Sequence, residues 1–271
     1  MSLLEVRGLG KTYVTKRSFL GRPVDRLVAV DDVTFSVEAG ETFAVVGESG
    51  AGKSTTGRLI LRLIEPDAGS IVFDGIDVRA LSRRDFRPYR RRMQMVFQDA
   101  YGSLDPRVTV HESVGEPLFI HFRTGRDERL AKAAELLERV GLGRHLFDRY
   151  PGELSGGQLQ RIAIARALTL NPALIVCDEP VAALDVSIRA QVLNLMKDLQ
   201  EQLGLAYVFI SHDLSLVEAF ADRIAVMSQG RVVEQGTVDE IFTDPKHAYT
   251  KQLLAAIPSP VPQALRESSL G

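Results

Sequence analysis

The residues most able to do chemistry in this sequence form a glycine-rich run in which a lysine is followed by a serine. The run lies between an apolar stretch, residues 42–46, and an amphipathic stretch, residues 55–63, a context that predicts a strand, a loop and the start of a helix. Glycines let backbone N–H groups point inward at the positive end of a helix dipole, where phosphate groups can bind. The spacing matches G-x-x-x-x-G-K-[ST], and the residues are Gly47, Glu48, Ser49, Gly50, Ala51, Gly52, Lys53 and Ser54.

Lys53 and Ser54 have distinct expected roles in a phosphate-binding loop of this kind. Lys53 would reach the β and γ phosphates of a nucleotide as a point charge, and Ser54 would offer its hydroxyl to Mg²⁺. An ordinary glycine-rich turn between a strand and a helix would contain similar residues, so the other motifs of the chain must decide between the two interpretations.

Two adjacent carboxylates, Asp178 and Glu179, follow a second apolar run, residues 173–177. An unbroken apolar run suits a strand that is covered on both faces in a parallel sheet, and such sheets hold their ligands at the carboxyl ends of the strands. Beside a phosphate loop, Asp178 would help to position Mg²⁺, and Glu179 would polarise the attacking water. In the absence of such a loop, the two carboxylates would only cap the end of a strand.

A serine, two glycines and a glutamine precede a later helical run, residues 159–168. Ser155 and Gln158 have the spacing of a capping box, which by itself would only start a helix. Glycine is a poor helix former, so the two glycines make sense if backbone N–H groups must approach an anion closely. One nucleotide has one γ-phosphate, so this surface would contact a nucleotide held by another molecule. The residues of this motif are Leu154, Ser155, Gly156, Gly157 and Gln158.

The composition is that of a soluble globular protein with one large or two small domains. The chain has 271 residues, of which 45% are hydrophobic and 25% charged, and its net charge of −2 argues against a general polyanion-binding domain. No stretch approaches the roughly 18 apolar residues of a membrane span. No secretory signal is visible, so a cytoplasmic setting is the default expectation. The single cysteine, Cys177, is expected to be a small buried hydrophobe.

The order of the expected elements indicates an α/β protein with an insertion. Residues 3–14 and 28–37 favour strands, with a polar loop at 15–26 between them. Strands and helices then alternate, which predicts a parallel α/β core. Residues 100–160 follow a helical pattern and would form an inserted helical subdomain. The arginine-rich run 83–92 is expected to be a solvated helix face, with a nucleic-acid contact as the alternative.

In their order and spacing, the motifs resemble those of the nucleotide-binding subunits of ABC transporters. The resemblance covers about residues 3–245 and implies a P-loop NTPase core with a parallel sheet, an N-terminal antiparallel β subdomain and an inserted helical subdomain. It places the ATPase domain at 1–245 and a C-terminal extension, partly disordered, at 246–271. The matching segments are the Walker A loop at 47–54, the Q-loop at Gln98, the signature motif at 154–158, Walker B at 174–179, the D-loop at 183–185 and the switch segment at 211–213.

The resemblance also implies roles for residues outside the phosphate loop. Gln98 would touch Mg²⁺ or the attacking water, and its loop would flex as the helical subdomain moves. His212 would hydrogen-bond the γ-phosphate, and Asp185 would help to align two subunits. Tyr13 resembles the aromatic residue that stacks on adenine, and the nucleotide-binding set extends to Thr55. The resemblance thus assigns catalysis to Glu179, His212 and Gln98, and the Mg²⁺ contacts to Ser54, Gln98 and Asp178.

Further segments resemble one group in particular, the ATPase subunits of bacterial oligopeptide and dipeptide importers. This implies ATP and Mg²⁺ as cofactors, a second ATPase subunit that is a sister chain or the chain itself, two integral membrane permease subunits and, indirectly, an extracytoplasmic substrate-binding protein. The protein would then be peripheral, on the cytoplasmic face of the inner membrane, without nucleic acid as a partner. The tail has no cysteine, so no iron–sulfur centre is expected. The segments are 57–66, 97–106 and 247–254.

Two alternatives remain at this point. One is a soluble ABC ATPase that acts on ribosomes or nucleic acid through the arginine-rich run, although such proteins usually carry two fused ATPase units or a long coiled-coil insertion. The other is a regulatory subunit with little catalysis, against which the intact Glu179 and His212 argue. The cargo itself would be selected by other chains, and similar systems carry metal chelates, sugars or glutathione.

Overall fold

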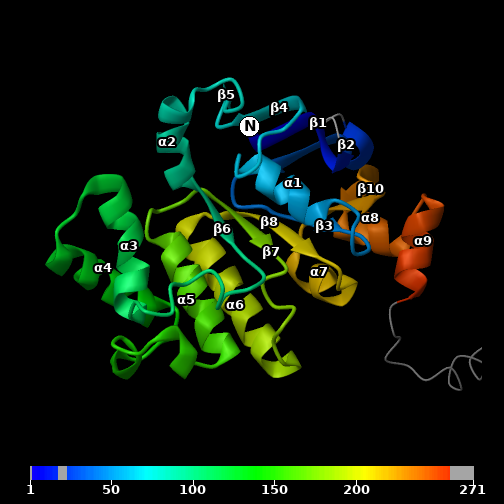
Figure 1. The fold of residues 1–271 in the computed structure, drawn as a ribbon. Helices are drawn as coiled ribbons and strands as arrows, with labels where there is room; N and C mark the ends of the chain where they lie inside the picture. The colour runs from blue at the N-terminus through cyan, green and yellow to red at the C-terminus, as the bar shows by residue number, and fades with distance from the viewer. Residues whose placement is uncertain (1, 18–22, 257–271) are drawn as a thin grey trace, which may run out of the picture.

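Two β-sheets form the framework of the computed structural model, which describes residues 2–17 and 23–256 (Figure 1). Within these residues the larger sheet has the strand order β10-β9-β3-β8-β7-β6, with all neighbours parallel except β10 and β9. The smaller sheet is antiparallel with the order β2-β1-β4-β5. The strands are β1 (Ser2–Arg17), β2 (Pro23–Glu38), β3 (Thr42–Val46), β4 (Ala68–Phe73), β5 (Ile76–Asp77), β6 (Met93–Val96), β7 (Leu174–Asp178), β8 (Ala206–Ser211), β9 (Arg223–Ser228) and β10 (Arg231–Thr237).

The helices cover both faces of the larger sheet. Helix α1 packs on the face that is shared with the smaller sheet, and α5, α6 and α7 pack on the opposite face, with α3 and α4 beside α5 (Figure 1). The predicted α/β core with a parallel sheet and an antiparallel N-terminal sheet is therefore confirmed. The helices are α1 (Lys53–Ile60), α2 (Arg83–Arg92), α3 (Val110–Phe122), α4 (Arg126–Arg139), α5 (Gly156–Leu168), α6 (Val186–Leu203), α7 (Leu214–Phe220), α8 (Val238–Thr243) and α9 (Ala248–Ala255).

The central strands are buried on both faces, which explains their unbroken apolar sequences. In β3, Ala44 and Val46 pack into the core beneath α5 and α6, whereas Phe43 and Val45 pack into the core between the two sheets. Cys177 on β7 is fully buried, and burial raises the pKa of its thiol, so the thiol stays protonated. The expectation that Cys177 is a buried hydrophobe is confirmed.

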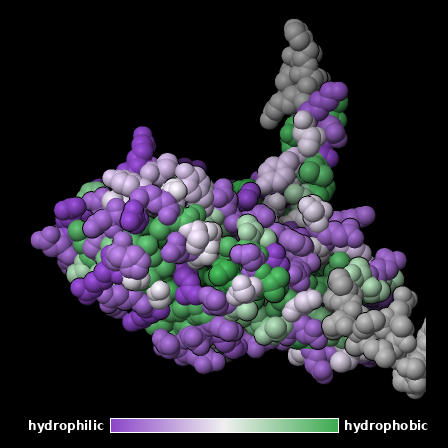
Figure 2. All heavy atoms as spheres, turned by 90° about the horizontal axis from the view of Figure 1, so that it is seen from below, coloured by the Kyte–Doolittle hydropathy of each residue, from purple (hydrophilic) through white to green (hydrophobic). Residues whose placement is uncertain are grey.

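The prediction of a polar loop at 15–26 is wrong for the residues of this range that the structure describes. Strand β1 continues to Arg17 and β2 begins at Pro23, and Val14 pairs with Arg26. The hairpin stands out from the body as an arm (Figure 2), so its side chains face solvent on both sides; Leu27, for example, is 56% exposed. A strand without a buried face needs no alternation of polar and apolar residues, so the usual strand signal is missing. Residues 18–22 of the expected loop lie outside the described residues.

The arginine-rich run 83–92 forms α2, as expected, but its arginines are not simply solvated. Arg87 donates a hydrogen bond to the Ile120 carbonyl at 2.8 Å, and Arg92 pairs with Asp74 at 2.5 Å. The guanidinium planes of further arginines lie over aromatic rings, an arrangement that guanidinium favours. These cation–π pairs are Arg90 with Phe86 and Arg91 with Phe122. Four arginines of the run thus have partners within this chain.

Helices α8 and α9 follow β10, the last strand of the larger sheet in the chain. Helix α9 follows α8 and belongs to the expected C-terminal extension, 246–271, of which residues 257–271 lie outside the described residues. In the described ranges, none of the helices combines the length and the apolar character that a membrane crossing requires.

Candidate nucleotide-binding site

The glycine-rich run forms a tight loop between the end of β3 at Val46 and the start of α1 at Lys53, as predicted. Gly47, Gly50 and Gly52 have φ values of 149°, 84° and 99°, a backbone region that favours glycine. A Cβ on Gly47 would lie 2.2 Å from the Met227 carbonyl oxygen, and one on Gly52 would lie 2.2 Å from that of Ala29. Glycine is thus required here both by the backbone conformation and by the close approach of β9 and β2.

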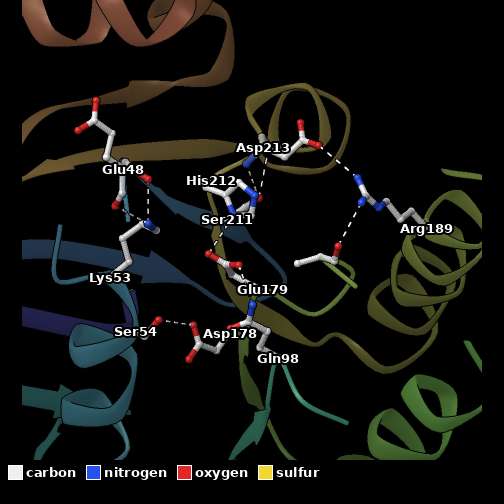
Figure 3. A network of polar contacts seen from close by, with 12 residues as sticks. Glu48, Lys53, Ser54, Gln98, Asp178, Glu179, Arg189, Ser211, His212 and Asp213 are labelled. Carbon is white, nitrogen blue, oxygen red and sulfur yellow. Dashed lines mark hydrogen bonds and ion pairs between the residues drawn. The ribbon is translucent and has the colours of Figure 1, made fainter. Parts of the chain in front are cut away.

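The Lys53 side chain folds back over this loop (Figure 3). Its Nζ donates hydrogen bonds to the carbonyl oxygens of Gly47 and Glu48, both at 2.8 Å, and the residue is only 5% exposed. Burial lowers the pKa of Lys53, while the nearby charges of Glu179 and Asp178 oppose this shift. The ammonium group is therefore held in one place by the loop carbonyls, near the charges of two carboxylates.

Ser54 and Asp178 bring two oxygen atoms together at the edge of the sheet. The Ser54 hydroxyl donates to Asp178 Oδ1 at 2.7 Å, and Arg58 lies 3.9 Å from Asp178 Oδ2. Burial raises the pKa of Asp178, an effect that the Ser54 hydrogen bond and the Arg58 charge oppose. Hydroxyl and carboxylate oxygens are the ligands that Mg²⁺ prefers, so these two residues fit the expected metal contacts.

Glu179 is the centre of a second group of contacts (Figure 3). Its Oε1 lies 3.0 Å from His212 Nδ1, and its Oε2 accepts a hydrogen bond from Gln98 Nε2 at 3.2 Å. The three residues follow β7, β8 and β6, which are neighbours in the sheet, so topology brings them to one edge. Glu179 also has a φ of 48°, unusual for a residue other than glycine, and backbone strain of this kind concentrates at functional sites.

Arg189 on α6 joins two loops beside this group. Its Nε donates to the carbonyl of Leu184, in the expected D-loop, at 2.6 Å, and its second terminal nitrogen donates to the carbonyl of Ala182, just before that loop, at 3.1 Å. Its other terminal nitrogen lies 3.6 Å from Asp213, the residue after His212 (Figure 3). One side chain therefore fixes the D-loop to the segment that carries the histidine.

The expected signature residues lie at the start of α5. The capping box is confirmed, since Ser155 Oγ accepts from the Gln158 N–H and Gln158 Oε1 accepts from the Ser155 N–H. A Cβ on Gly157 would lie 2.6 Å from Ile188 of α6, and one on Gly156 would lie 3.2 Å from Leu184. Close packing of α5 against α6 and the D-loop is thus a second physical reason for the two glycines. The sequence alone did not indicate this reason.

Three further predicted residues, Tyr13, Thr55 and Asp185, take no part in these polar contacts. Tyr13 is on β1 opposite Leu27, with the Lys11 ammonium 5.7 Å from the centre of its ring. Thr55 is in the first turn of α1, and Asp185 occupies the N-cap position of α6, where its side chain makes no capping hydrogen bond. The structure brings together Lys53, Ser54, Gln98, Asp178, Glu179 and His212.

Three residues of the site received no role in the sequence analysis. Arg58 lies one turn after Ser54 on α1, and Arg189 follows Asp185 by one turn of α6, so helical spacing from the motifs could have indicated both. Tyr249 of α9 contacts the phosphate loop, and no local signal predicts a contact between segments so far apart in the chain.

Arg189→Ala is expected to lower the free energy of unfolding by about 1–3 kcal/mol, because it removes charge-assisted hydrogen bonds and leaves two loop carbonyls without their donor. Urea denaturation of the full chain without nucleotide measures this. The control is Arg144→Ala, whose side chain is 80% exposed and pairs with Glu138, so its loss should cost about 0–1 kcal/mol. Equal stabilities of the two variants would contradict the role given to Arg189.

Comparison with known proteins agrees with this geometry. The fold and the site define a P-loop nucleoside triphosphatase. Residues 30–182 match the model of the family described as ABC transporter, and residues 233–270 match that described as oligopeptide/dipeptide transporter, C-terminal region. The chain belongs to the ABC transporter family and is a transport ATPase of that class.

Individual relatives of the chain are transport ATP-binding proteins and ABC cassettes. The chain is 50% identical to the oligopeptide transport ATP-binding protein of Bacillus subtilis, with 96% of this chain and 84% of the relative covered. It is 49% identical to the dipeptide transport ATP-binding protein of Haemophilus influenzae, with 98% and 81% covered. A solved dimer of a bacterial ABC transporter cassette is 32% identical, with a TM-score of 0.77 and 87% and 98% covered. A dimeric cassette in a post-hydrolysis state, bound to ADP and Pi, is also 32% identical, with a TM-score of 0.76 and the same coverage.

Proposed function

We propose that this chain binds and hydrolyses ATP to power a bacterial ABC importer for oligopeptides or dipeptides. The observation that carries the proposal is the convergence of Lys53, Ser54 and Asp178 with Glu179, Gln98 and His212 at one edge of the parallel sheet. The peptide cargo is supported by the names of the relatives and by the match of the C-terminal region.

In this proposal each group has one task. Lys53 and the N–H groups of the phosphate loop bind the β and γ phosphates, and Tyr13 stacks on the adenine. Mg²⁺, held by Ser54, Gln98 and Asp178 when bound, supplies positive charge to the phosphate oxygens. Glu179 accepts the proton of the attacking water, and His212 donates a hydrogen bond to the γ-phosphate. The contacts of Gln98 and His212 with Glu179 keep this carboxylate in place before ATP arrives.

A second ATPase subunit would complete the site. ATP would lie between the phosphate loop of one subunit and the helix that begins after Ser155 in the other, with Asp185 aligning the two. The dimeric form of the solved relatives supports this arrangement. The second subunit is either another copy of this chain or a sister chain.

A groove next to Gln98 is the surface that we assign to the permease subunits. It has a volume of about 290 Å³ and lies between β6, α3 and α5. Phe97 precedes Gln98 and lines the groove with Pro117 and Ile120, and Ile120 is 47% exposed. The lining also includes Arg90 and Arg166, so a short amphipathic helix of a membrane subunit fits this surface. Its movement would reach Glu179 through Gln98. The chain would thus be peripheral, on the cytoplasmic face of the cell membrane.

The domain boundaries follow from the same proposal. Residues 1–245 would be the ATPase domain, the helical subdomain would span about 100–160, and 246–271 would be the C-terminal extension. Helices α3 and α4 lie within the range of the helical subdomain, and α9 within that of the extension.

Purification of the tagged chain from its own cells in mild detergent tests the function. We expect two integral membrane proteins and a second ATPase subunit to co-purify. Ile120→Asp should remove the membrane proteins without changing ATP affinity, because it replaces an exposed apolar side chain of the groove with a charged one. Ile76→Asp, on β5 and 41% exposed, is the matched control and should retain them. Recovery of ribosomes or DNA-bound proteins in place of membrane proteins would contradict the importer and favour a soluble ABC ATPase.

A further inference from the structure

Helix α9 reaches the phosphate loop through one hydrogen bond. The backbone N–H of Glu48 donates to the hydroxyl of Tyr249 at 3.1 Å, although the two residues are 201 positions apart. The C-terminal region therefore contacts the loop that is proposed to bind the nucleotide phosphates.

The peptide group that Tyr249 contacts is also the one that holds Lys53. The carbonyl of Gly47 and the N–H of Glu48 belong to the same peptide unit; the carbonyl accepts from Lys53 Nζ at 2.8 Å, and the N–H donates to Tyr249. A peptide unit is planar, so the direction of its N–H fixes the direction of its C=O. The Tyr249 hydroxyl thus orients an acceptor of the Lys53 ammonium.

The tyrosine is itself fixed by the fold. The Glu234 carboxylate on β10 accepts from the backbone N–H groups of Lys246 and His247, at 2.6 and 3.0 Å, just before α9 begins. The Nδ1 atom of His247 then accepts from the N–H of Tyr249 at 3.2 Å. The Tyr249 ring is half-buried against the core beneath α5 and α6, together with Leu253 and Leu254. These contacts determine where its hydroxyl lies.

We propose that Tyr249 is a positioning residue for the nucleotide phosphates. It acts through the peptide between Gly47 and Glu48 on Lys53, so that the C-terminal region contributes to ATP affinity. This rests on the proposed role of Lys53 in phosphate binding. The hydroxyl does not touch the reacting atoms, so its loss affects nucleotide binding more than the chemical step.

Tyr249→Phe in the full chain tests the proposal, because phenylalanine keeps the ring packing and removes only the hydroxyl. We expect the Kd for a fluorescent, non-hydrolysable ATP analogue and the KM for ATP to rise about 2- to 10-fold, the effect of losing one hydrogen bond. The kcat and the Tm without nucleotide should match those of the control Tyr89→Phe. Tyr89 lies on α2 against the core between the two sheets, away from the phosphate loop.

Lys53→Ala, measured with the same analogue, distinguishes a failure of the proposed role of Lys53 from a failure of the role proposed for Tyr249. If Lys53→Ala binds the analogue as tightly as the wild type, the proposed role of Lys53 fails and this inference fails with it. If Lys53→Ala loses affinity and Tyr249→Phe does not, only the inference is overturned. A lower Tm of Tyr249→Phe at unchanged ATP affinity would make the hydroxyl merely structural and would also overturn it.

Discussion

Glu179→Gln is expected to bind ATP with wild-type affinity and to hydrolyse it about 10²- to 10⁴-fold more slowly, the usual contribution of a general base. The carboxylate lies within 3.2 Å of both Gln98 and His212, and an amide of the same shape can keep hydrogen bonds to these neighbours. An amide cannot accept a proton from water at neutral pH. Binding and hydrolysis should therefore separate in this variant.

Steady-state phosphate release measures the hydrolysis rate, and titration with a fluorescent ATP analogue measures the affinity. Glu201→Gln, at an exposed position of α6, makes the same chemical change away from the site and should leave both unchanged. Near-normal turnover of Glu179→Gln would remove Glu179 from the mechanism. A low turnover of the wild type itself would favour the regulatory subunit instead.

Lys53→Ala is expected to lower the affinity for ATP by about 10- to 10²-fold, as the loss of charge-assisted hydrogen bonds to the phosphates would. The ammonium group is buried and donates hydrogen bonds to two carbonyls of the loop, so its charge is fixed where the phosphates are expected to bind. Nucleotide titration gives the affinity, and the Tm without nucleotide shows whether the fold is intact. Lys132→Ala on α4, which loses a surface ion pair with Glu135, is the control. An unchanged Kd with a normal Tm would speak against the phosphate-binding loop.

The parts of the fold that were predicted best from the sequence are those that impose a local pattern of residue types. The strands β3 and β7 are buried on both faces, so their unbroken apolar runs identified them. The phosphate loop was found because close packing and positive φ values impose glycine at fixed positions. The distal arm of β1 and β2 was missed because neither of its faces packs against a core.

The site was predictable only as a set of residues, without its contacts. The order of the motifs placed Gln98, Glu179 and His212 in one site, but the hydrogen bonds between them depend on strand order in the sheet. The contact of Tyr249 with the phosphate loop depends on how the end of the chain folds back. Spacing along the sequence holds no information on such a contact.

The burial of Cys177 has a practical consequence. It is the only cysteine in the sequence, and its thiol is fully buried and remains protonated, so a reagent that modifies thiolates will not label the native protein there. A cysteine introduced at an exposed position would be the single reactive site in each subunit. The wild-type chain is therefore ready for attaching a spectroscopic probe, and the approach and separation of two subunits could be followed without first removing native cysteines.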